Sequence, residues 1–243
     1  MAGHSKWSNI KHRKGRQDAK KGKIFTKLSK EIFQAVRQGG DDPGTNHNLR
    51  LAIDKAKQAN MPNDNIERTI NKALGNVEGV VYEEITYEGY APHGVAVYVQ
   101  ALTDNKNRTA AEVRLAFNKN NGNLGESGCV GFMFKRKGVL LFEKNESLDG
   151  ELFMLEAIDA GAEDVIFSEE AFEVYTTPEE LQQVRKALID SLETDPSVSE
   201  VSMIPDTYTP VSETQAEEVL QLIEALEDND DVQNVYHNLE VKD

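Results

Sequence analysis

The chain has 243 residues, a net charge of −15 and 39% hydrophobic residues, a length that favours two or three domains over one small domain. No run approaches the roughly 20 apolar residues that span a bilayer, and no apolar stretch follows the basic start, so we expect neither a membrane partner nor a secretory signal. The one cysteine, Cys129, cannot form an intramolecular disulfide, which is compatible with a cytoplasmic protein.

Charge is divided unevenly along the chain. Residues 1–30 contain ten Lys or Arg and one acid, Asp18, whereas residues 138–243 contain four basic and 28 acidic residues. A basic head on an acidic body is typical of a protein that contacts polyanions through a terminal segment. The acidic body would repel a phosphate backbone, so we expect contact to be confined to the head and its surroundings.

Residues 1–22 are predicted to form a flexible basic arm, because their few apolar side chains cannot offset the entropy of ordering. A helical domain is expected over residues 23–78. Apolar residues recur every four positions from Ile24 to Val36, which predicts a first helix that ends at Gly39. Two further amphipathic helices are predicted, the last of them ending at Gly75.

The pattern then becomes rich in β-branched and aromatic residues. Strands are predicted over residues 81–89, 94–102 and 130–134, with a helix over residues 107–120 between the last two.

Residues 138–204 alternate in the order β-α-β-β-α-β, which is typical of a ferredoxin-like sandwich. The predicted elements are strand 139–142, helix 152–160, strands 164–167 and 171–175, helix 179–192 and strand 200–204. The tail adds a helix over 213–227 and a strand over 232–239, which supply the α-β pair that the middle segment lacks.

We therefore predict an α+β fold with a small three-helix N-terminal domain and two ferredoxin-like α/β sandwich domains. In this organisation the third domain, residues 137–205, is inserted into the second, residues 79–136 plus 206–243.

The strongest functional signal is the cationic arm and its continuation on the first helix. Cations pair with phosphates and release counterions, and Trp7 could stack on an exposed base. The alternative is a solvated, charge-rich terminus without a target. The predicted nucleic-acid-binding residues in this region are Lys6, Trp7, Lys11, Arg13, Lys14, Arg16, Lys20, Lys21, Lys23, Lys27 and Lys30.

A second signal is the segment 104–109, which joins a predicted strand to a helix start. Free backbone N–H groups there, together with Lys106 and Arg108, could hold a phosphate. Ordinary helix capping by Asn107 or Asp104 explains the same residues equally well, and the sequence leaves both interpretations open.

A third signal is the glycine series Gly122, Gly125, Gly128 and Gly131. It matches neither a phosphate-binding loop nor a dinucleotide fingerprint, because a strand follows it, and a structural loop is the better interpretation.

We expect no enzyme, no cofactor and no metal site. The histidines form no ligand spacing, and Cys129 is best explained as a small buried side chain. The acidic run Asp228–Asp231 lacks the glycine and closing glutamate of a calcium loop and is interpreted as the turn that ends a helix.

Several motifs resemble the YebC/PmpR family across nearly the whole length. They are the opening MAGHSKWSNIKHRKGRQDAKKGKIFTKLSKEI and the stretches 60–66, 82–90, 103–109, 122–125 and 131–134. Cys129 stands where family members commonly have Ser.

The resemblance implies a helical first domain followed by two α/β domains, with no established catalytic residues. It also implies a DNA-binding transcriptional regulator, since bacterial members are described in this way. A mitochondrial relative is described as a translational activator, so a ribosome-associated translation factor that binds ribosomal RNA is the alternative. Phosphate contacts do not read sequence, so the arm cannot separate promoter DNA from ribosomal RNA, and the oligomeric state is left open.

Overall fold

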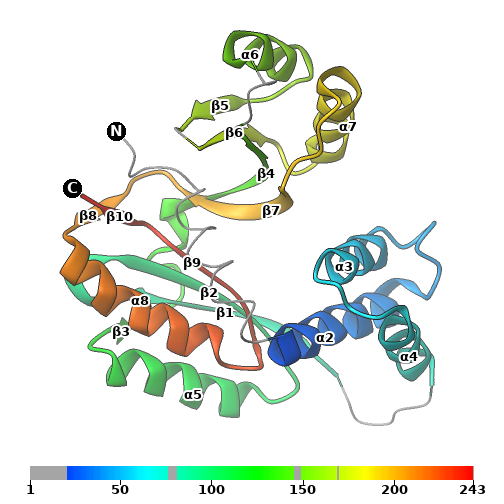
Figure 1. Ribbon diagram of the computed structural model, residues 1–243. Helices are drawn as coiled ribbons and strands as arrows, with labels where there is room; N and C mark the ends of the chain where they lie inside the picture. The colour runs from blue at the N-terminus through cyan, green and yellow to red at the C-terminus, as the bar shows by residue number, and fades with distance from the viewer. Residues whose placement is uncertain (1–20, 76–80, 145–148, 169, 243) are drawn as a thin grey trace. The chain divides into compact units, whose positions relative to one another are not determined.

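The computed structural model describes residues 21–75, 81–144, 149–168 and 170–242. These fall into two compact units (Figure 1). The larger unit contains described residues up to 131 together with 213–237, and the smaller unit contains residues 132–212 together with 238–242. The predicted arm lies almost wholly outside the described residues, and its flexibility stays a prediction.

Three helices open the larger unit: α2 (Lys21–Gly39), α3 (His47–Gln58) and α4 (Asn63–Leu74). The apolar stripe of α2 is buried as predicted, with Ile32 and Leu49 fully enclosed between the helices. Asn46 fixes the turn between α2 and α3, because its side chain accepts from the Leu49 N–H (3.0 Å) and donates to the Ala35 carbonyl (2.8 Å).

The rest of the larger unit is a four-stranded sheet covered by two helices. The strands are β1 (Glu83–Tyr90), β2 (Ala96–Thr103), β3 (Asn123–Leu124) and β9 (Val232–His237), in the order β3-β1-β2-β9, with antiparallel neighbours. A short 3-10 turn, η1 (Pro92–Gly94), joins β1 to β2. Helices α5 (Lys106–Lys119) and α8 (Glu213–Glu227) lie side by side on one face of this sheet (Figure 1).

The smaller unit contains a second sheet with the order β5-β6-β4-β7 and antiparallel neighbours. Its strands are β4 (Phe134–Glu143), β5 (Asp164–Phe167), β6 (Ala171–Thr176) and β7 (Val198–Pro205). Helices α6 (Gly150–Asp159) and α7 (Leu181–Leu192) bury Phe153, Leu181 and Leu188 in a core with Phe142 and Phe172. A short parallel pair, β8 (Thr209–Val211) and β10 (Leu239–Val241), completes the unit.

The predicted α+β class with a helical start and two α/β sandwiches is confirmed. The tail strand β9 pairs with β2 and thereby completes the first sheet, while the βαββαβ segment forms a sheet of its own. The predicted limits of the domains stay predictions.

One predicted strand is wrong. Residues 131–133 form a 3-10 turn, η2 (Gly131–Met133), and β4 runs unbroken from Phe134. The physical reason is that the Glu88 side chain takes the N–H groups of Val130 and Gly131, which a strand would have offered to a neighbouring strand.

Candidate nucleic-acid interface

Three predicted binding lysines lie along one face of α2. Lys23, Lys27 and Lys30 are spaced by four and three residues, which brings them to the same side of a helix. In the larger unit this side meets the carboxyl-terminal end of α8 and the turn that follows it.

The α2 lysines bind backbone carbonyls at this helix end. Lys23 Nζ donates to the Asp228 carbonyl (3.0 Å), Lys27 Nζ to the Glu227 carbonyl (2.6 Å) and Lys30 Nζ to the Asp230 carbonyl (2.9 Å). The last carbonyls of a helix lack partners within the helix and carry its negative dipole end, so cations are favoured there. Burial lowers the pKa of Lys27, although the nearby Glu227 carboxylate opposes this effect. The three lysines therefore join α2 to α8.

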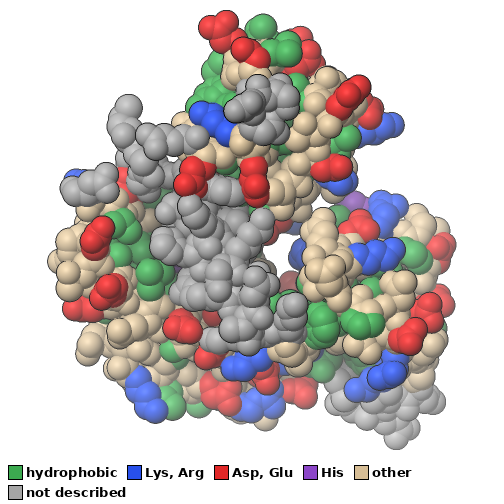
Figure 2. Space-filling model, in the orientation of Figure 1, with side chains coloured by type: hydrophobic (Ala, Val, Ile, Leu, Met, Phe, Trp, Pro, Cys, Tyr) green, Lys and Arg blue, Asp and Glu red, His purple; other side chains and the backbone are tan. Residues whose placement is uncertain are grey.

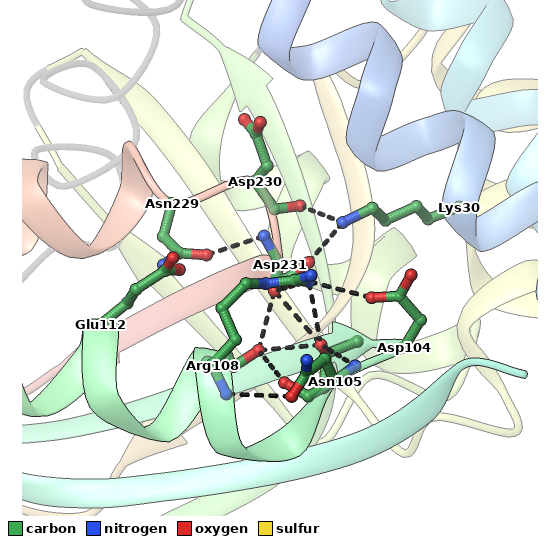
Figure 3. Close-up of polar contacts among 10 residues, drawn as sticks. Lys30, Asp104, Asn105, Arg108, Glu112, Asn229, Asp230 and Asp231 are labelled. Atoms are coloured by element: carbon green, nitrogen blue, oxygen red, sulfur yellow. Dashed lines mark hydrogen bonds and ion pairs between the residues drawn. The ribbon is translucent and has the colours of Figure 1, made fainter. Parts of the chain in front are cut away.

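Asp231 is the centre of the same cluster (Figure 3). It ends the short turn 228–231 that follows α8, and it exposes only 3% of its surface. Its carboxylate accepts from Lys30 Nζ (2.6 Å), Arg108 Nη2 (2.6 Å), Thr109 Oγ1 (2.7 Å) and Thr103 Oγ1 (3.2 Å). One carboxylate in the turn before β9 thus contacts helix α2, helix α5 and strand β2.

The cluster keeps Asp231 ionised. Burial alone would raise the pKa of this carboxyl, but hydrogen bonds from Lys30, Arg108 and Thr109 outweigh burial and lower the pKa to about 2. The charge of a buried carboxylate is tolerated when it is paired and fully hydrogen-bonded, as it is here.

The start of α5 is capped by its own sequence. The Asn105 side chain accepts from the Arg108 N–H (3.1 Å), so the cap is neither of the two residues that the sequence suggested. The Arg108 guanidinium also donates to Asp104 (2.9 Å), and its hydrogen bonds to Asp231 and Asp104 raise its pKa. Lys106 pairs with Glu83. These contacts support capping, and the phosphate site at this helix start stays a prediction.

A cavity of about 600 Å³ lies beside the cluster. Its lining mixes both signs of charge: Lys23, Thr26, Lys30, Arg108, Glu112, Ala225, Asp228, Asn229, Asp230 and Asp231. Because carboxylates line the wall together with the cations, this cavity is not a uniformly positive groove of the kind that follows a nucleic-acid backbone.

The predicted binding residues therefore divide into two groups. Lys23, Lys27, Lys30, Lys106 and Arg108 each have a partner within the larger unit. The others, Lys6, Trp7, Lys11, Arg13, Lys14, Arg16 and Lys20, together with the side chain of Lys21, lie outside the described residues. Their roles stay predictions.

The sequence interpretation missed Asp231 and treated it only as part of a turn. A signal was present, because four polar or acidic residues directly after a helix are unfavourable beside its negative end unless cations face them. The second part of the signal was the lysine spacing on α2, which brings three cations to one face of that helix.

The glycine series is a structural loop, as expected, and Glu88 organises it. Its carboxylate, 6% exposed, accepts from the N–H groups of Gly128 (2.8 Å), Val130 (2.8 Å) and Gly131 (2.6 Å). Burial opposes ionisation, but these three hydrogen bonds lower the pKa of Glu88. Gly128 adopts a φ of 89°, which a residue with a side chain rarely adopts.

The described part of the chain offers neither a membrane-spanning helix nor a cluster of metal ligands. None of its helices is long and apolar enough to cross a membrane. Among residues 21–75, 81–144, 149–168 and 170–242, no three His, Cys, Asp or Glu side chains are grouped so that they could hold a metal ion.

Comparison with known proteins gives matches along almost the whole chain. Residues 5–76 match the family described as TACO1/YebC protein N-terminal domain, and residues 82–239 match TACO1/YebC second and third domain. Two relatives carry the name probable transcriptional regulatory protein. The one from Bacillus licheniformis is 59% identical over 98% of this chain and 100% of its own, and the one from Anoxybacillus flavithermus is 56% identical over 99% and 98%.

A solved structure agrees with these matches. The crystal structure of a conserved hypothetical protein from Aquifex aeolicus has 47% identity and a TM-score of 0.81, and covers 93% of each chain. These matches, which extend along almost the whole chain, show that it belongs to the TACO1/YebC family.

Proposed function

We propose that this chain is a DNA-binding transcriptional regulator that contacts nucleic acid through its basic N-terminal arm. The observation that carries the proposal is the division of charge: ten cations and one acid in residues 1–30, against four cations and 28 acids in residues 138–243. The names of the relatives support a regulatory role. The proposal includes that the protein is cytoplasmic and is not an enzyme.

The internal contacts of α2 and α5 support two separate roles for the cations, one in the fold and one in nucleic-acid binding. Lys27, Lys30 and Arg108 would have to leave carbonyl or carboxylate partners before they could bind a phosphate. We therefore assign these three to holding the larger unit together. Nucleic-acid contact is assigned to Lys6, Trp7, Lys11, Arg13, Lys14, Arg16, Lys20 and Lys21, with Lys23 at the edge of the contact region.

The same arm would also bind RNA, because phosphate contacts carry no sequence information. A ribosome-associated translation factor that contacts ribosomal RNA is therefore the alternative. A basic arm on an acidic body suits this role, since the arm could enter an RNA-walled site while the body is repelled from the phosphates.

Crosslinking in growing cells, followed by sequencing of both bound DNA and bound RNA, separates these functions. Discrete promoter peaks that disappear when Lys11 and Lys14 are changed to Ala would support the transcriptional function. Dominant ribosomal RNA crosslinks without promoter peaks would contradict it and support the translational alternative. Lys55→Ala serves as the matched control, because it removes a cation that pairs with Glu31 and is not among the predicted binding residues.

A further inference from the structure

Helix α6 of the smaller unit exposes an apolar face. Leu152, Leu155 and Ile158 recur every three residues and expose 51%, 62% and 56% of their surface, and Met154 exposes 41%. Residues three apart lie on the same side of a helix, so the first three form one stripe. We refer to these four residues as the α6 apolar surface.

The fold of the smaller unit does not require this surface. The opposite side of α6 buries Phe153 and Ala157, and the Phe153 ring stacks on Phe172 with 4.5 Å between ring centroids. Phe153 also makes an edge contact with Phe142 at 5.2 Å. Since α6 is already anchored through these rings, its second apolar side needs another explanation. Single exposed apolar residues are ordinary, but contiguous groups of them mark interaction sites.

Acidic residues border the α6 apolar surface. Glu151, Glu156 and Asp159 lie on the same helix, which contains no Lys or Arg. None of these three carboxylates has an ion pair within the described part of the chain. Figure 2 shows hydrophobic and acidic side chains gathered together over α6, at the top of the view.

The acidic residues beside the α6 apolar surface determine which kind of binding partner is favoured. A two-fold contact with a second copy would bring the acidic borders of both copies together, which like charges oppose. An anionic lipid surface and a nucleic-acid backbone would be repelled for the same reason. A helix with leucine-like side chains on one face and cations beside them complements both parts of the surface.

We propose that the α6 apolar surface docks a basic amphipathic helix of a partner protein. The apolar side chains of the partner pack on Leu152, Leu155 and Ile158, and its Lys or Arg side chains pair with Glu151, Glu156 and Asp159. This interaction is independent of nucleic-acid binding by the N-terminal arm.

The test measures binding of a labelled synthetic helix, with leucines on one face and lysines on the other, to the full-length chain by fluorescence anisotropy. Leu155→Ser with Ile158→Ser should weaken binding at least about tenfold, since two central anchors are lost. Leu115→Ser is the matched control, because Leu115 is 52% exposed on α5 of the other unit, and it should leave binding unchanged.

A second variant tests the charged border without changing the apolar residues. Replacing Glu151, Glu156 and Asp159 by their amides should weaken binding and reduce its salt dependence. It also keeps the test decisive if the serine variant proves unstable in thermal unfolding.

Three results would overturn the proposal. The first is equal binding by the serine variant and the unchanged chain. The second is equal binding of a control peptide with the same residues in an order that leaves no apolar face. The third is self-association of the unchanged chain in sedimentation that the serine variant abolishes, because this would assign the surface to a second copy.

Discussion

Asp231 is buried against Lys30 and Arg108, so removal of its charge would take a carboxylate partner from each of these two cations. Breaking a buried ion pair from one side is far more costly than losing an exposed pair. The two carboxylates that share Arg108 allow a direct comparison, because Asp104 is 42% exposed and Asp231 is 4% exposed at the side chain.

Asp231→Asn should therefore lower the free energy of unfolding by about 3–5 kcal/mol, measured by urea unfolding. Asp104→Asn is the matched control and should cost no more than about 1 kcal/mol. Equal effects of the two changes would show that the cluster does not hold the larger unit together.

The pKa of Asp231 also predicts how stability depends on pH. Its folded pKa of about 2 lies below the ordinary value of 3.8, so the native state favours the ionised form. The resulting stabilisation is fully present above about pH 4 and is lost as the pH falls toward 2. We expect Asp231→Asn to remove part of the acid-induced loss of stability, on the order of 1–2 kcal/mol, in unfolding measured from pH 5 to 2. Parallel pH profiles for both proteins would contradict this.

A further prediction concerns Glu88, whose carboxylate accepts hydrogen bonds from the glycine loop. Glu88→Gln would turn an amide NH₂ group toward backbone N–H donors that now share a carboxylate, and should cost about 2–3 kcal/mol. Hydrogen exchange at Gly128, Val130 and Gly131 should become faster, while Glu84→Gln, at an exposed position of the same strand, should change neither the stability nor the exchange of these amides. Unchanged protection of the three amides would argue against this role of Glu88.

At the scale of elements, the contact between α2 and α8 depends on three lysines that bind carbonyls. Lys27→Met retains the apolar stem but removes the hydrogen bond to the Glu227 carbonyl, and should lower the free energy of unfolding by about 1 kcal/mol. The control is Lys55→Met on α3, where an exposed pair with Glu31 is lost. An effect no larger than that of the control would mean that the helix end is solvated equally well by water.

Elements with a strong period could be predicted from the sequence. The tail helix was expected over 213–227 and is observed as Glu213–Glu227, because its apolar residues repeat regularly and acidic turn residues follow it. The βαββαβ segment was also predicted in the correct order, since its strands and helices alternate cleanly.

Contacts between distant residues could not be predicted. Periodicity cannot indicate that Glu88 reaches across to residues 128–131 and replaces a strand by a turn. For the same reason, the lysines of α2 were interpreted as phosphate ligands, although they bind a helix end about 200 positions away in the chain. Local sequence shows a cation but not the partner that the fold brings to it.

At the scale of the whole molecule, the internal cations Lys27, Lys30 and Arg108 and the cations of residues 1–20 have different expected roles. The former are engaged within the fold, and the latter are proposed to bind nucleic acid. Loss of the arm should therefore reduce nucleic-acid binding, whereas loss of the internal lysine contacts should reduce stability.

The most direct measurement compares the full chain with the chain that begins at Lys21, using fluorescence anisotropy on labelled duplex DNA and single-stranded RNA over a range of salt concentrations. Removal of residues 1–20 should abolish most binding to both. Lys11→Ala with Lys14→Ala should reduce the salt slope by about 0.9 for each lost phosphate contact on DNA. Unchanged affinity and slope in the shortened chain would contradict the claim that this arm contacts nucleic acid.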